Sequence, residues 1–323
     1  MRNLYKDPLR IAILGCGTFA QRRLLMAVPQ VDTVKVVCIQ KRDLAEAKKV
    51  AAKFHIPHAV ATREELLRQP DVEAVWITTP NFTHEEDAIA CAKAGKPTLC
   101  EKPLAPTLEG AVRMIEAFER ANLPFFVGHS MRFRPAVRTA QKFVLDETLG
   151  KLMNIRIYAS IPIPKENWRY KKEYGGGVLQ DLGIHLIDLI HFITGEEIES
   201  LVVQAHVEEV DLTIAVLCRL SGGAMASFEC SFIQPFYTGF EVIGTHGRLV
   251  SQNSLRQTMD PIETLCHIRE DDSQMYFPLK AANVYEEELK HFAEAAVGLT
   301  PSIIPAEISI KNQKVLDEIS SLI

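Results

Sequence analysis

The chain has 323 residues, 47% of them hydrophobic, which is enough to bury two cores. A net charge of -5 with mixed signs argues against a nucleic-acid partner. No apolar run reaches the length of a membrane span, and the start, MRNLYKDP, lacks the apolar region of a signal peptide, so no membrane partner is expected. Seven cysteines without a C-x-x-C pair are typical of reduced thiols, and we expect a cytoplasmic protein.

A dinucleotide-binding fingerprint follows the first predicted strand. Residues 9–14 are apolar and β-like, and the next six have the form G-x-G-x-x-A. The first glycine makes a tight turn, the second admits a pyrophosphate to the helix N-terminus, and the small third residue lets the helix pack on the strand. A helix and a β-branched run at 31–39 complete the required βαβ unit. The predicted cofactor-binding residues are Gly15, Gly17, Thr18, Phe19 and Ala20. Cys16 is either a small filler or a thiol open to oxidants.

The second strand ends in Gln40-Lys41-Arg42-Asp43, where an NAD enzyme would place an acid on the ribose. Asp43 with Glu46 three residues later fits a helix capping box, so we interpret it as a cap. Lys41 and Arg42 are then left where a 2′-phosphate would lie. The alternative is two solvated side chains on a surface loop. The pattern favours NADP(H), with NAD(H) possible.

Two further helix starts and a lysine follow in the same predicted domain. Thr62 to Glu65 fits a capping box, and Thr83 with Glu86 predicts another after the strand at 72–79. His84 would lie in the first turn of that helix, where a surface position is the simpler interpretation. The strand at 97–100 ends in Glu101-Lys102-Pro103. Lys102 is a candidate electrophile or acid, or else a salt-bridge partner of Glu101 or another acid.

The residues from Gly175 to Asp188, GGGVLQDLGIHLID, predict a buried helix that carries acid/base groups. At 100° per residue Asp181, His185 and Asp188 share one stripe, and apolar residues cover the rest. Asp181 and His185 could simply satisfy one another, or a carboxylate could hold a catalytic imidazole. Glycines at 175, 176, 177 and 183 allow a backbone or ligand to approach closely, which favours the catalytic interpretation.

We place a domain boundary near Gly128, where the strand-like residues 124–127 end and a new arginine-containing loop, 129–135, begins. Residues 152–161 are strand-like. After the helix that carries His185, period-two alternation predicts strands at 201–204, 212–220 and 224–232, with a hairpin at Gly222-Gly223, and shorter strands are expected at 240–243 and 264–268. Two helical patterns, 285–297 and 306–319, close the chain. The expected fold class is α/β, with domain 1–128 followed by domain 129–323. A partly apolar outer sheet face predicts a homo-oligomer, dimer or tetramer, through the second domain.

These motifs in this order resemble the Gfo/Idh/MocA family of oxidoreductases. The resemblance rests on the fingerprint, Thr79-Pro80-Asn81 with His84, Glu101-Lys102-Pro103, and the pattern G-G-x-x-x-D-x-G-x-H-x-x-D. It implies a doubly wound parallel Rossmann sheet, then an α/β domain with a large, mostly antiparallel open sheet. It also implies activity on sugars, cyclitols or related carbonyl compounds.

The resemblance further implies roles for single residues. Lys102 would contact substrate and nicotinamide ribose, Asp181 would bind substrate and tune the site, and His185 would exchange the proton. The other implied cofactor-side residues are Thr79, Pro80, Asn81, His84 and Glu101, and the implied substrate-pocket residues are Arg132, Trp168 and Arg169.

Three hypotheses follow from the sequence. The leading one is an NADP(H)-dependent dehydrogenase or reductase acting on a secondary alcohol or ketone, with Lys102, Asp181 and His185 as catalytic residues. The second is a cofactor-binding regulator without chemistry, which would need only the fingerprint. The third is a metal enzyme using Asp181, His185 and Asp188, but these lie on one helix without a second cluster, so no metal is expected.

Overall fold

The computed structural model describes residues 2–255, 262–280 and 282–323. Contacts divide the chain into two units, Met1–His129 with Asn283–Ile310, and Ser130–Ala282 with Lys311–Ile323. The expected boundary at residue 128 lies one residue from the first division. Our assignment of 283–310 to the second domain is wrong, because this segment returns to the first unit. The Val127 N–H donates to the Ile304 carbonyl at 3.0 Å, and the Ala306 N–H donates to that of Phe125 at 3.0 Å.

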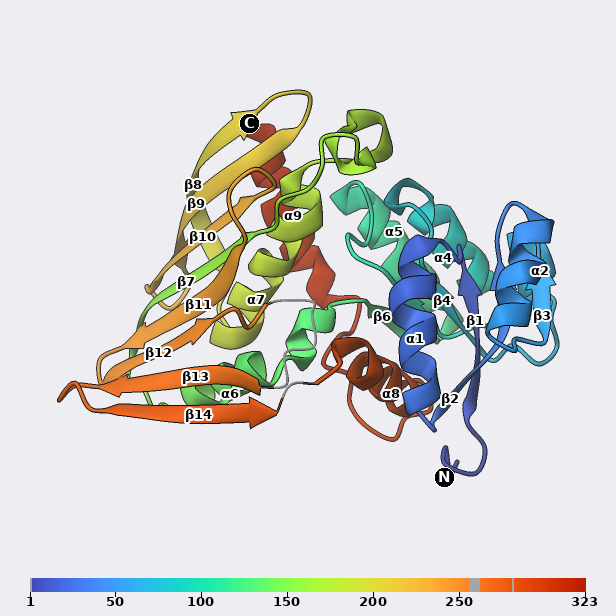
Figure 1. Ribbon diagram of the computed structural model, residues 1–323, viewed down its shortest axis with the longest axis horizontal. Helices are drawn as coiled ribbons and strands as arrows, with labels where there is room; N and C mark the ends of the chain where they lie inside the picture. The colour runs from blue at the N-terminus through green and yellow to red at the C-terminus, as the bar shows by residue number, and fades with distance from the viewer. Residues whose placement is uncertain (1, 256–261, 281) are drawn as a thin grey trace. The chain divides into compact units, whose positions relative to one another are not determined.

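The first unit contains the predicted doubly wound parallel sheet. Its strand order is β3-β2-β1-β4-β5-β6, so the order reverses between β1 and β4 (Figure 1). Ligands of such sheets bind at the carboxyl ends of the strands beside this reversal. The strands are β1 Leu9–Leu14, β2 Val34–Gln40, β3 His58–Val60, β4 Ala74–Ile77, β5 Thr98–Cys100 and β6 Phe125–Val127.

Helices connect these strands. A continuous helical run after the fingerprint comprises η1 Ala20–Leu24, α1 Leu25–Ala27 and η2 Val28–Gln30. The others are α2 Leu44–Lys53, α3 Arg63–Leu67, η3 Asn81–Thr83, α4 His84–Lys93, α5 Leu108–Ala121 and, from the returning segment, α8 Val284–Ala296. Buried apolar residues of β1, β4, β5, α4 and α5 form one continuous core.

Two of the three predicted helix caps are confirmed. Thr62 and Glu65 form a reciprocal capping box, and Asp43 Oδ1 accepts hydrogen bonds from the N–H groups of Ala45 and Glu46. The cap predicted for Thr83 is wrong. A 3₁₀ turn precedes α4, so the Thr83 hydroxyl donates to the Pro80 carbonyl at 2.9 Å instead of capping the helix.

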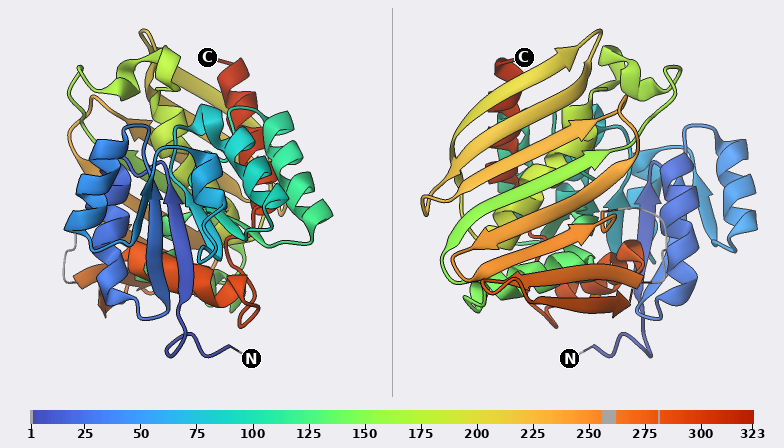
Figure 2. Two further views of the ribbon diagram at one scale, coloured as in Figure 1. Left: turned by 90° about the vertical axis from the view of Figure 1, so that its right-hand side faces the viewer. Right: turned by 60° about the vertical axis from the view of Figure 1, so that its left-hand side comes forward.

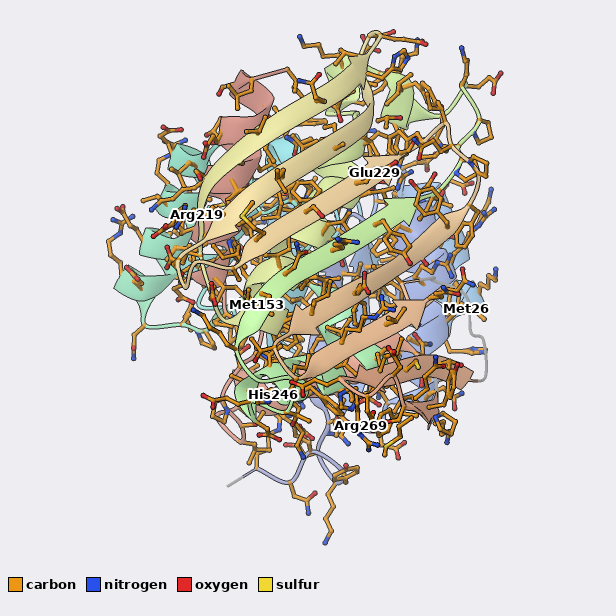
Figure 3. The ribbon with its side chains drawn as sticks, turned by 90° about the vertical axis from the view of Figure 1, so that its left-hand side faces the viewer. Met26, Met153, Arg219, Glu229, His246 and Arg269 are labelled. Atoms are coloured by element: carbon orange, nitrogen blue, oxygen red, sulfur yellow. The ribbon has the colours of Figure 1, made fainter. Side chains whose placement is uncertain are left out.

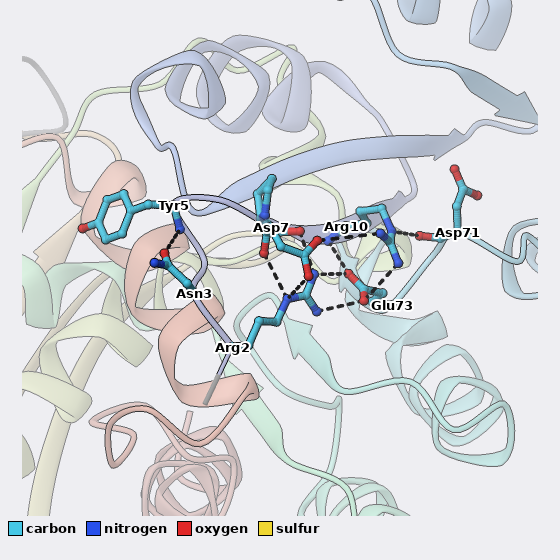
Figure 4. A network of polar contacts seen from close by, with 8 residues as sticks. Arg2, Asn3, Tyr5, Asp7, Arg10, Asp71 and Glu73 are labelled. Carbon is cyan, nitrogen blue, oxygen red and sulfur yellow. Dashed lines mark hydrogen bonds and ion pairs between the residues drawn. The ribbon is translucent and has the colours of Figure 1, made fainter.

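An ion-pair network ties the N-terminal segment to the sheet (Figure 4). Arg2 donates to both carboxylate oxygens of Glu73 at 2.8 and 2.9 Å, and the backbone N–H of Arg10 donates to Glu73 at 2.9 Å. Glu73 precedes β4 and Arg10 lies in β1. The network therefore fixes the ends of two adjacent strands opposite the ligand-binding edge.

The second unit is built on an eight-stranded sheet of order β14-β13-β12-β11-β7-β10-β9-β8. All neighbours are antiparallel except β7 and β10, which confirms the predicted open sheet. Buried and exposed side chains alternate along β9, as expected for a sheet covered on one face. The strands are β7 Leu152–Ser160, β8 Ile198–Val207, β9 Asp211–Leu220, β10 Met225–Ser231, β11 Tyr237–Gly244, β12 Gly247–Gln252, β13 Ile262–Arg269 and β14 Gln274–Lys280.

Helices lie on one face of this sheet and leave the other face visible (Figure 2). They are η4 Ser130–Phe133, α6 Pro135–Leu145, η5 Trp168–Tyr170, η6 Lys172–Tyr174, η7 Leu179–Gly183, α7 Ile184–Thr194 and α9 Ile308–Ser321. Sequence reasoning predicted neither β12 nor β14.

The stretch Lys172–Thr194 is long and apolar enough to span a membrane, but 72% of its most apolar window is buried, as in a core helix.

The uncovered face of the sheet mixes apolar and charged side chains (Figure 3). Met153, Val202 and Leu217 are exposed there, together with Arg219. This composition is compatible with the homo-oligomer expected from the sequence, which stays a prediction.

Candidate functional site

The fingerprint turn has the backbone geometry that a bound pyrophosphate requires. Gly15 has φ +88°, and a Cβ there would lie 2.5 Å from the Thr79 Cγ2 atom. A Cβ on Gly17 would meet only the Gly15 carbonyl oxygen among the described residues, at 3.8 Å. The backbone at Gly17 is therefore open on one side, directly before the helix begins at Thr18. These residues fit the phosphates of a dinucleotide.

The end of β2 places an amide and an ammonium group against this turn. Gln40 Oε1 accepts from the Gly15 N–H at 3.2 Å, and Gln40 Nε2 donates to the Ala61 carbonyl at 2.7 Å. Lys41 Nζ donates to the Cys16 carbonyl at 3.2 Å, while Arg42 is exposed. With Asp43 occupied as a helix cap, the side chains that contact the turn here are a buried amide and the Lys41 ammonium group. Sequence reasoning missed the support that Gln40 gives to the turn.

Cys16 is a filler in the turn. It is 0% exposed, and burial raises the pKa of its thiol to about 11. The alternative of a thiol open to oxidants is therefore wrong. The seven cysteines, all within the described residues, are buried free thiols, as expected.

His84 connects two loops at the carboxyl edge of the sheet. It is 1% exposed, so the surface interpretation is wrong. Its Nδ1 lies 3.0 Å from the Pro103 carbonyl oxygen, and its Nε2 lies 2.9 Å from that of Thr79. The Thr79 hydroxyl in turn donates to Asp87 at 2.7 Å. His84 thus fixes the loops that carry Asn81 and Lys102, and a direct cofactor contact of its own stays a prediction.

Glu101 is the buried member of the Glu-Lys-Pro motif. Its Oε1 accepts a hydrogen bond from the indole Nε1 of Trp76 at 3.2 Å. Burial raises the pKa of Glu101, and the positive charge of Lys102 opposes this shift. The sequence analysis gave attraction between Lys102 and Glu101 as the alternative to a catalytic role of Lys102. A substrate contact of Lys102 stays a prediction.

The glycines before the buried helix are explained by close approach of protein groups. The Gly177 N–H donates to the Arg169 carbonyl at 2.9 Å, and a Cβ on Gly176 would collide with that same carbonyl. Gly177 has φ +118°, and a Cβ there would collide with Asp211. Asp211 Oδ2 accepts from the Leu179 N–H at 2.6 Å, a support for the helix start that sequence reasoning missed. The groups that approach are the Arg169 backbone at Gly176 and the Asp211 side chain at Gly177.

The helix itself departs from the regular geometry that the sequence analysis assumed. Residues Leu179–Gly183 form a π-helical turn, and α7 continues to Thr194, where Gly195 ends it with φ +72°. The 100° spacing does not hold across this wider turn. Asp181 and His185 are partly exposed, whereas Asp188 is 1% exposed, so the three do not share one accessible stripe.

Asp181 belongs to a cluster with two of the three residues expected at the substrate pocket. Arg169 Nε donates to Asp181 Oδ2 at 2.6 Å. The Arg169 guanidinium also lies 4.6 Å from the centre of the Trp168 ring, which is 47% exposed. The second unit therefore brings Trp168, Arg169 and Asp181 together, and His185 follows Asp181 by four residues on the same helical run. An exposed aromatic ring with a cation and a carboxylate is suited to bind a polyhydroxylated ligand.

Asp188 has a structural role in the second unit. Arg132 donates to its two carboxylate oxygens, Nε at 2.8 Å and Nη2 at 2.6 Å. Asn312 Nδ2 donates to Asp188 Oδ1 at 2.8 Å. Arg132 is 5% exposed and its guanidinium lies 4.6 Å from the Phe192 ring centre. The expectation that Asp188 shares the acid/base stripe is wrong, and a substrate contact of Arg132 stays a prediction.

Within residues 2–255, 262–280 and 282–323, no group of three or more His, Cys, Asp or Glu side chains could hold a metal ion.

Two family models match the chain. One, described as an oxidoreductase family with an NAD-binding Rossmann fold, matches residues 9–129, and the GFO/IDH/MocA C-terminal domain matches residues 137–250. The 1,5-anhydro-D-fructose reductase of Ensifer adhaerens is 31% identical over 298 residues, covering 90% of this chain and 88% of that protein. The dTDP-3,4-didehydro-2,6-dideoxy-alpha-D-glucose 3-reductase of Saccharopolyspora spinosa is 31% identical over 76% of this chain and 75% of that protein.

The fold is also shared with solved structures. A 3-ketoreductase from Actinomadura kijaniata in complex with NADP and TDP-benzene superposes with a TM-score of 0.87, at 23% identity, over 98% of each chain. At this identity the similarity is one of fold.

The ion pair of Asp188 yields a stability prediction. Replacing Asp188 by alanine leaves the Arg132 guanidinium buried without its carboxylate, which costs about 3–5 kcal/mol of folding stability. Urea unfolding measures this loss. Lys49→Ala, which breaks the exposed pair with Glu46, is the control and should leave the unfolding midpoint unchanged. An Asp188→Ala protein as stable as the wild type would show that the pair does not anchor the helix.

Proposed function

The chain belongs to the Gfo/Idh/MocA family of oxidoreductases, and on this basis we propose that it is an NADP(H)-dependent reductase or dehydrogenase. Its substrate is a sugar, cyclitol or related compound with a secondary alcohol or ketone. His185 donates or accepts the proton, and Lys102 polarises the substrate oxygen. The named reductases among its relatives act on keto-sugars, which supports this substrate class.

The first unit would hold the cofactor. Gly15, Gly17 and the N–H groups from Thr18 onward suit the pyrophosphate, with Phe19 and Ala20 in the same turn. Lys41 at the turn and Arg42 beside it suit a 2′-phosphate. The loops that His84 joins would add Thr79, Pro80, Asn81 and Glu101. A structure of similar fold holds NADP, in agreement with this choice.

The second unit would hold the substrate and supply the proton. Bound nicotinamide exchanges hydride at its C4 with the substrate carbon. When a ketone is reduced, His185 releases a proton to the carbonyl oxygen, and the alcohol returns it in the opposite direction. Lys102 stabilises negative charge on this oxygen. Asp181, held by Arg169, binds substrate hydroxyl groups, and Trp168 packs on the apolar face of the ring.

The observation that carries this proposal is a difference in exposure between side chains of one helical run. Asp181 and His185 are accessible on a segment whose remaining side chains are mostly buried and whose buried Asp188 is anchored by Arg132 and Asn312. A rigid support for two accessible acid/base groups is the arrangement that proton transfer needs.

A cofactor-binding regulator remains the second candidate, because the fingerprint alone would serve it. The two candidates separate in one screen. Purified protein with NADPH or NADP⁺ is offered keto-sugars, anhydro-sugars, inositols and dihydrodiols, and nicotinamide absorbance is followed. Turnover with any of them supports the enzyme, whereas tight cofactor binding without turnover supports the regulator.

The cofactor proposal predicts selectivity for the 2′-phosphate. NADP(H) should bind more tightly than NAD(H), and Arg42→Ala should weaken NADP(H) alone, because losing a charge-assisted contact costs about 1.5–3 kcal/mol. Titration calorimetry measures both dissociation constants. Lys48→Ala, an exposed lysine on α2, is the control. Equal dissociation constants of NADP(H) and NAD(H) for the wild type would refute the assignment.

The role of His185 predicts a loss of rate without a loss of fold. His185→Asn should keep the melting temperature and the cofactor affinity while kcat falls roughly 10²–10⁴-fold, the scale of a lost general acid or base. Steady-state kinetics and thermal unfolding give the two quantities. If the variant instead loses melting temperature and keeps its rate per folded molecule, His185 is a core residue.

Shared action of Lys102 and His185 on one oxygen predicts non-additive losses. Lys102→Met and His185→Asn should each be severe, while the double variant should be much less impaired than the product of the two factors. The measurement is a double-mutant cycle on kcat/KM with the best substrate. Strictly multiplicative losses would show that the two residues act independently.

A further inference from the structure

The apolar face of α8 contains one carboxyl group. The side chains that this helix buries recur at the spacing of a single face, and they are Val284, Tyr285, Glu288, Leu289, Phe292 and Ala293. Glu288 is 0% exposed, and neither of its carboxyl oxygens has a hydrogen-bond partner among the residues that the structure describes. An ionised carboxylate in such a place is very costly. The charge state of Glu288 therefore requires an explanation.

A second buried carboxyl group lies in the same unit. Glu101 follows β5 and is held by the Trp76 indole N–H. A Cβ on Gly128 would come within 3.0–3.1 Å of the Glu101 carboxyl atoms, so the end of β6 encloses this group closely. The negative charge of Glu101, together with burial, raises the pKa of Glu288 well above its usual value. The geometry agrees, because the Phe292 ring of α8 lies 5.4 Å from the Phe126 ring of β6, and β6 pairs with β5, which Glu101 follows. Glu288 lies one turn before Phe292, so the two carboxyl groups lie on neighbouring elements and repel when both are ionised.

The surroundings of the two carboxyl groups differ. Glu101 receives the Trp76 N–H and the backbone N–H of Lys102, and the Lys102 ammonium attracts it. These contacts favour the anion. Glu288 experiences only burial and the like charge of Glu101, and both oppose ionisation. Two coupled carboxyl groups of this kind titrate as a unit, and the proton resides on the less stabilised anion.

Other charged groups lie on α8 and on the elements packed against it. The elements packed against it carry Arg22 and Arg23 on η1 and Lys35 on β2. On α8, His291 lies one turn after Glu288, and its Nε2 accepts a hydrogen bond from the Ile303 N–H at 3.0 Å. The charge that acts on Glu288 is that of Glu101.

We propose that Glu101 and Glu288 together bind one proton, which Glu288 carries, and that Glu288 is a positioning residue that leaves Glu101 as the counterion of Lys102. With the proton present, the charges of Glu288, Glu101 and Lys102 sum to zero. Loss of the proton adds a second negative charge to a buried pair and displaces Glu101 from Trp76 and Lys102. The shared proton is independent of the enzyme's activity, whereas its effect on the reaction rests on the proposed function of Lys102.

The stability of the full chain tests the shared proton. Because the pKa of Glu288 is raised in the folded protein, the proton stabilises the fold fully below the pKa of an unfolded glutamate, and this contribution is lost as pH rises toward the folded pKa. Glu288→Gln mimics the neutral acid at every pH. Between the two pKa values, the folding constant of the wild type relative to Glu288→Gln should fall about tenfold per pH unit. Urea unfolding from about pH 5 to about pH 9 measures this ratio.

The matched control is Glu287→Gln, an exposed glutamate on the same helix, whose stability relative to the wild type should not depend on pH in this range. A pH-independent ratio for Glu288→Gln, or a variant less stable than the wild type throughout, would overturn the proposal. If Glu288→Gln does not fold, infrared spectroscopy of the wild type decides. The carboxylic-acid carbonyl band of a buried group should persist at neutral pH and disappear as pH rises, and its absence at neutral pH would overturn the shared proton.

Activity tests the positioning role. With any substrate that the protein turns over, the wild type should lose kcat/KM at alkaline pH as the proton leaves, and Glu288→Gln should move this loss by about one pH unit or more to higher pH. Glu288→Leu, which is also neutral at every pH, should move the alkaline loss in the same direction as Glu288→Gln if it folds. Identical pH profiles for the wild type and Glu288→Gln, alongside the expected stability result, would refute the positioning role and leave the shared proton intact. If the protein turns over no substrate, the positioning role is contradicted. The stability measurement then decides alone whether the proton is bound.

Discussion

The buried ion pair between Arg132 and Asp188 is the interaction on which the candidate chemistry of the second unit depends. It joins η4 to α7, and Asn312 of α9 adds a hydrogen bond to the same carboxylate. Removing two charges from water is costly, and the bidentate geometry with the third donor offsets that cost. The result is a helix whose position is fixed at Asp188, near the middle of α7. Asp181 and His185 lie seven and three residues before this anchor on the same helical run.

In the first unit, hydrogen bonds of the uncharged side chains described next hold the candidate cofactor-binding loops in place. Gln40 supports the Gly15 turn from one side, and Thr79 contacts it from the other. His84 links the Thr79 loop to the loop of the Glu-Lys-Pro motif through backbone carbonyls. The residues around the predicted phosphate position are therefore held by the protein before any cofactor binds, which lowers the ordering cost of binding.

Features set by local spacing could be predicted from the sequence. The βαβ unit, the Thr62 capping box and the alternating strands of the second sheet depend on neighbours within a few residues, and the structure contains them. Features set by distant partners could not. The helix at 284–296 has the expected amphipathic pattern, but the pattern does not state that it packs on the first unit.

In the candidate site, too, the features that sequence reasoning missed are those set by irregular geometry or by distant partners. The π-helical turn at 179–183 changes which residues share a face, and nothing in the apolar pattern indicates it. Asp188 and His84 were misplaced because their partners lie 56 and about 20 residues away in the sequence. Glu288 did give a signal, a glutamate within the apolar positions of a helix, and burial in the structure explains why that signal matters.

We propose that this chain transfers hydride between NADP(H) and a secondary carbon, with the second unit providing the proton. The most direct test is a reaction with 4-deuterated NADPH and a panel of keto-sugars, followed by NMR of the products. We expect deuterium on the new carbinol carbon in one stereochemical form, with slower transfer by His185→Asn at full cofactor occupancy. NADPH binding without deuterium in any product would contradict it and favour a regulatory protein.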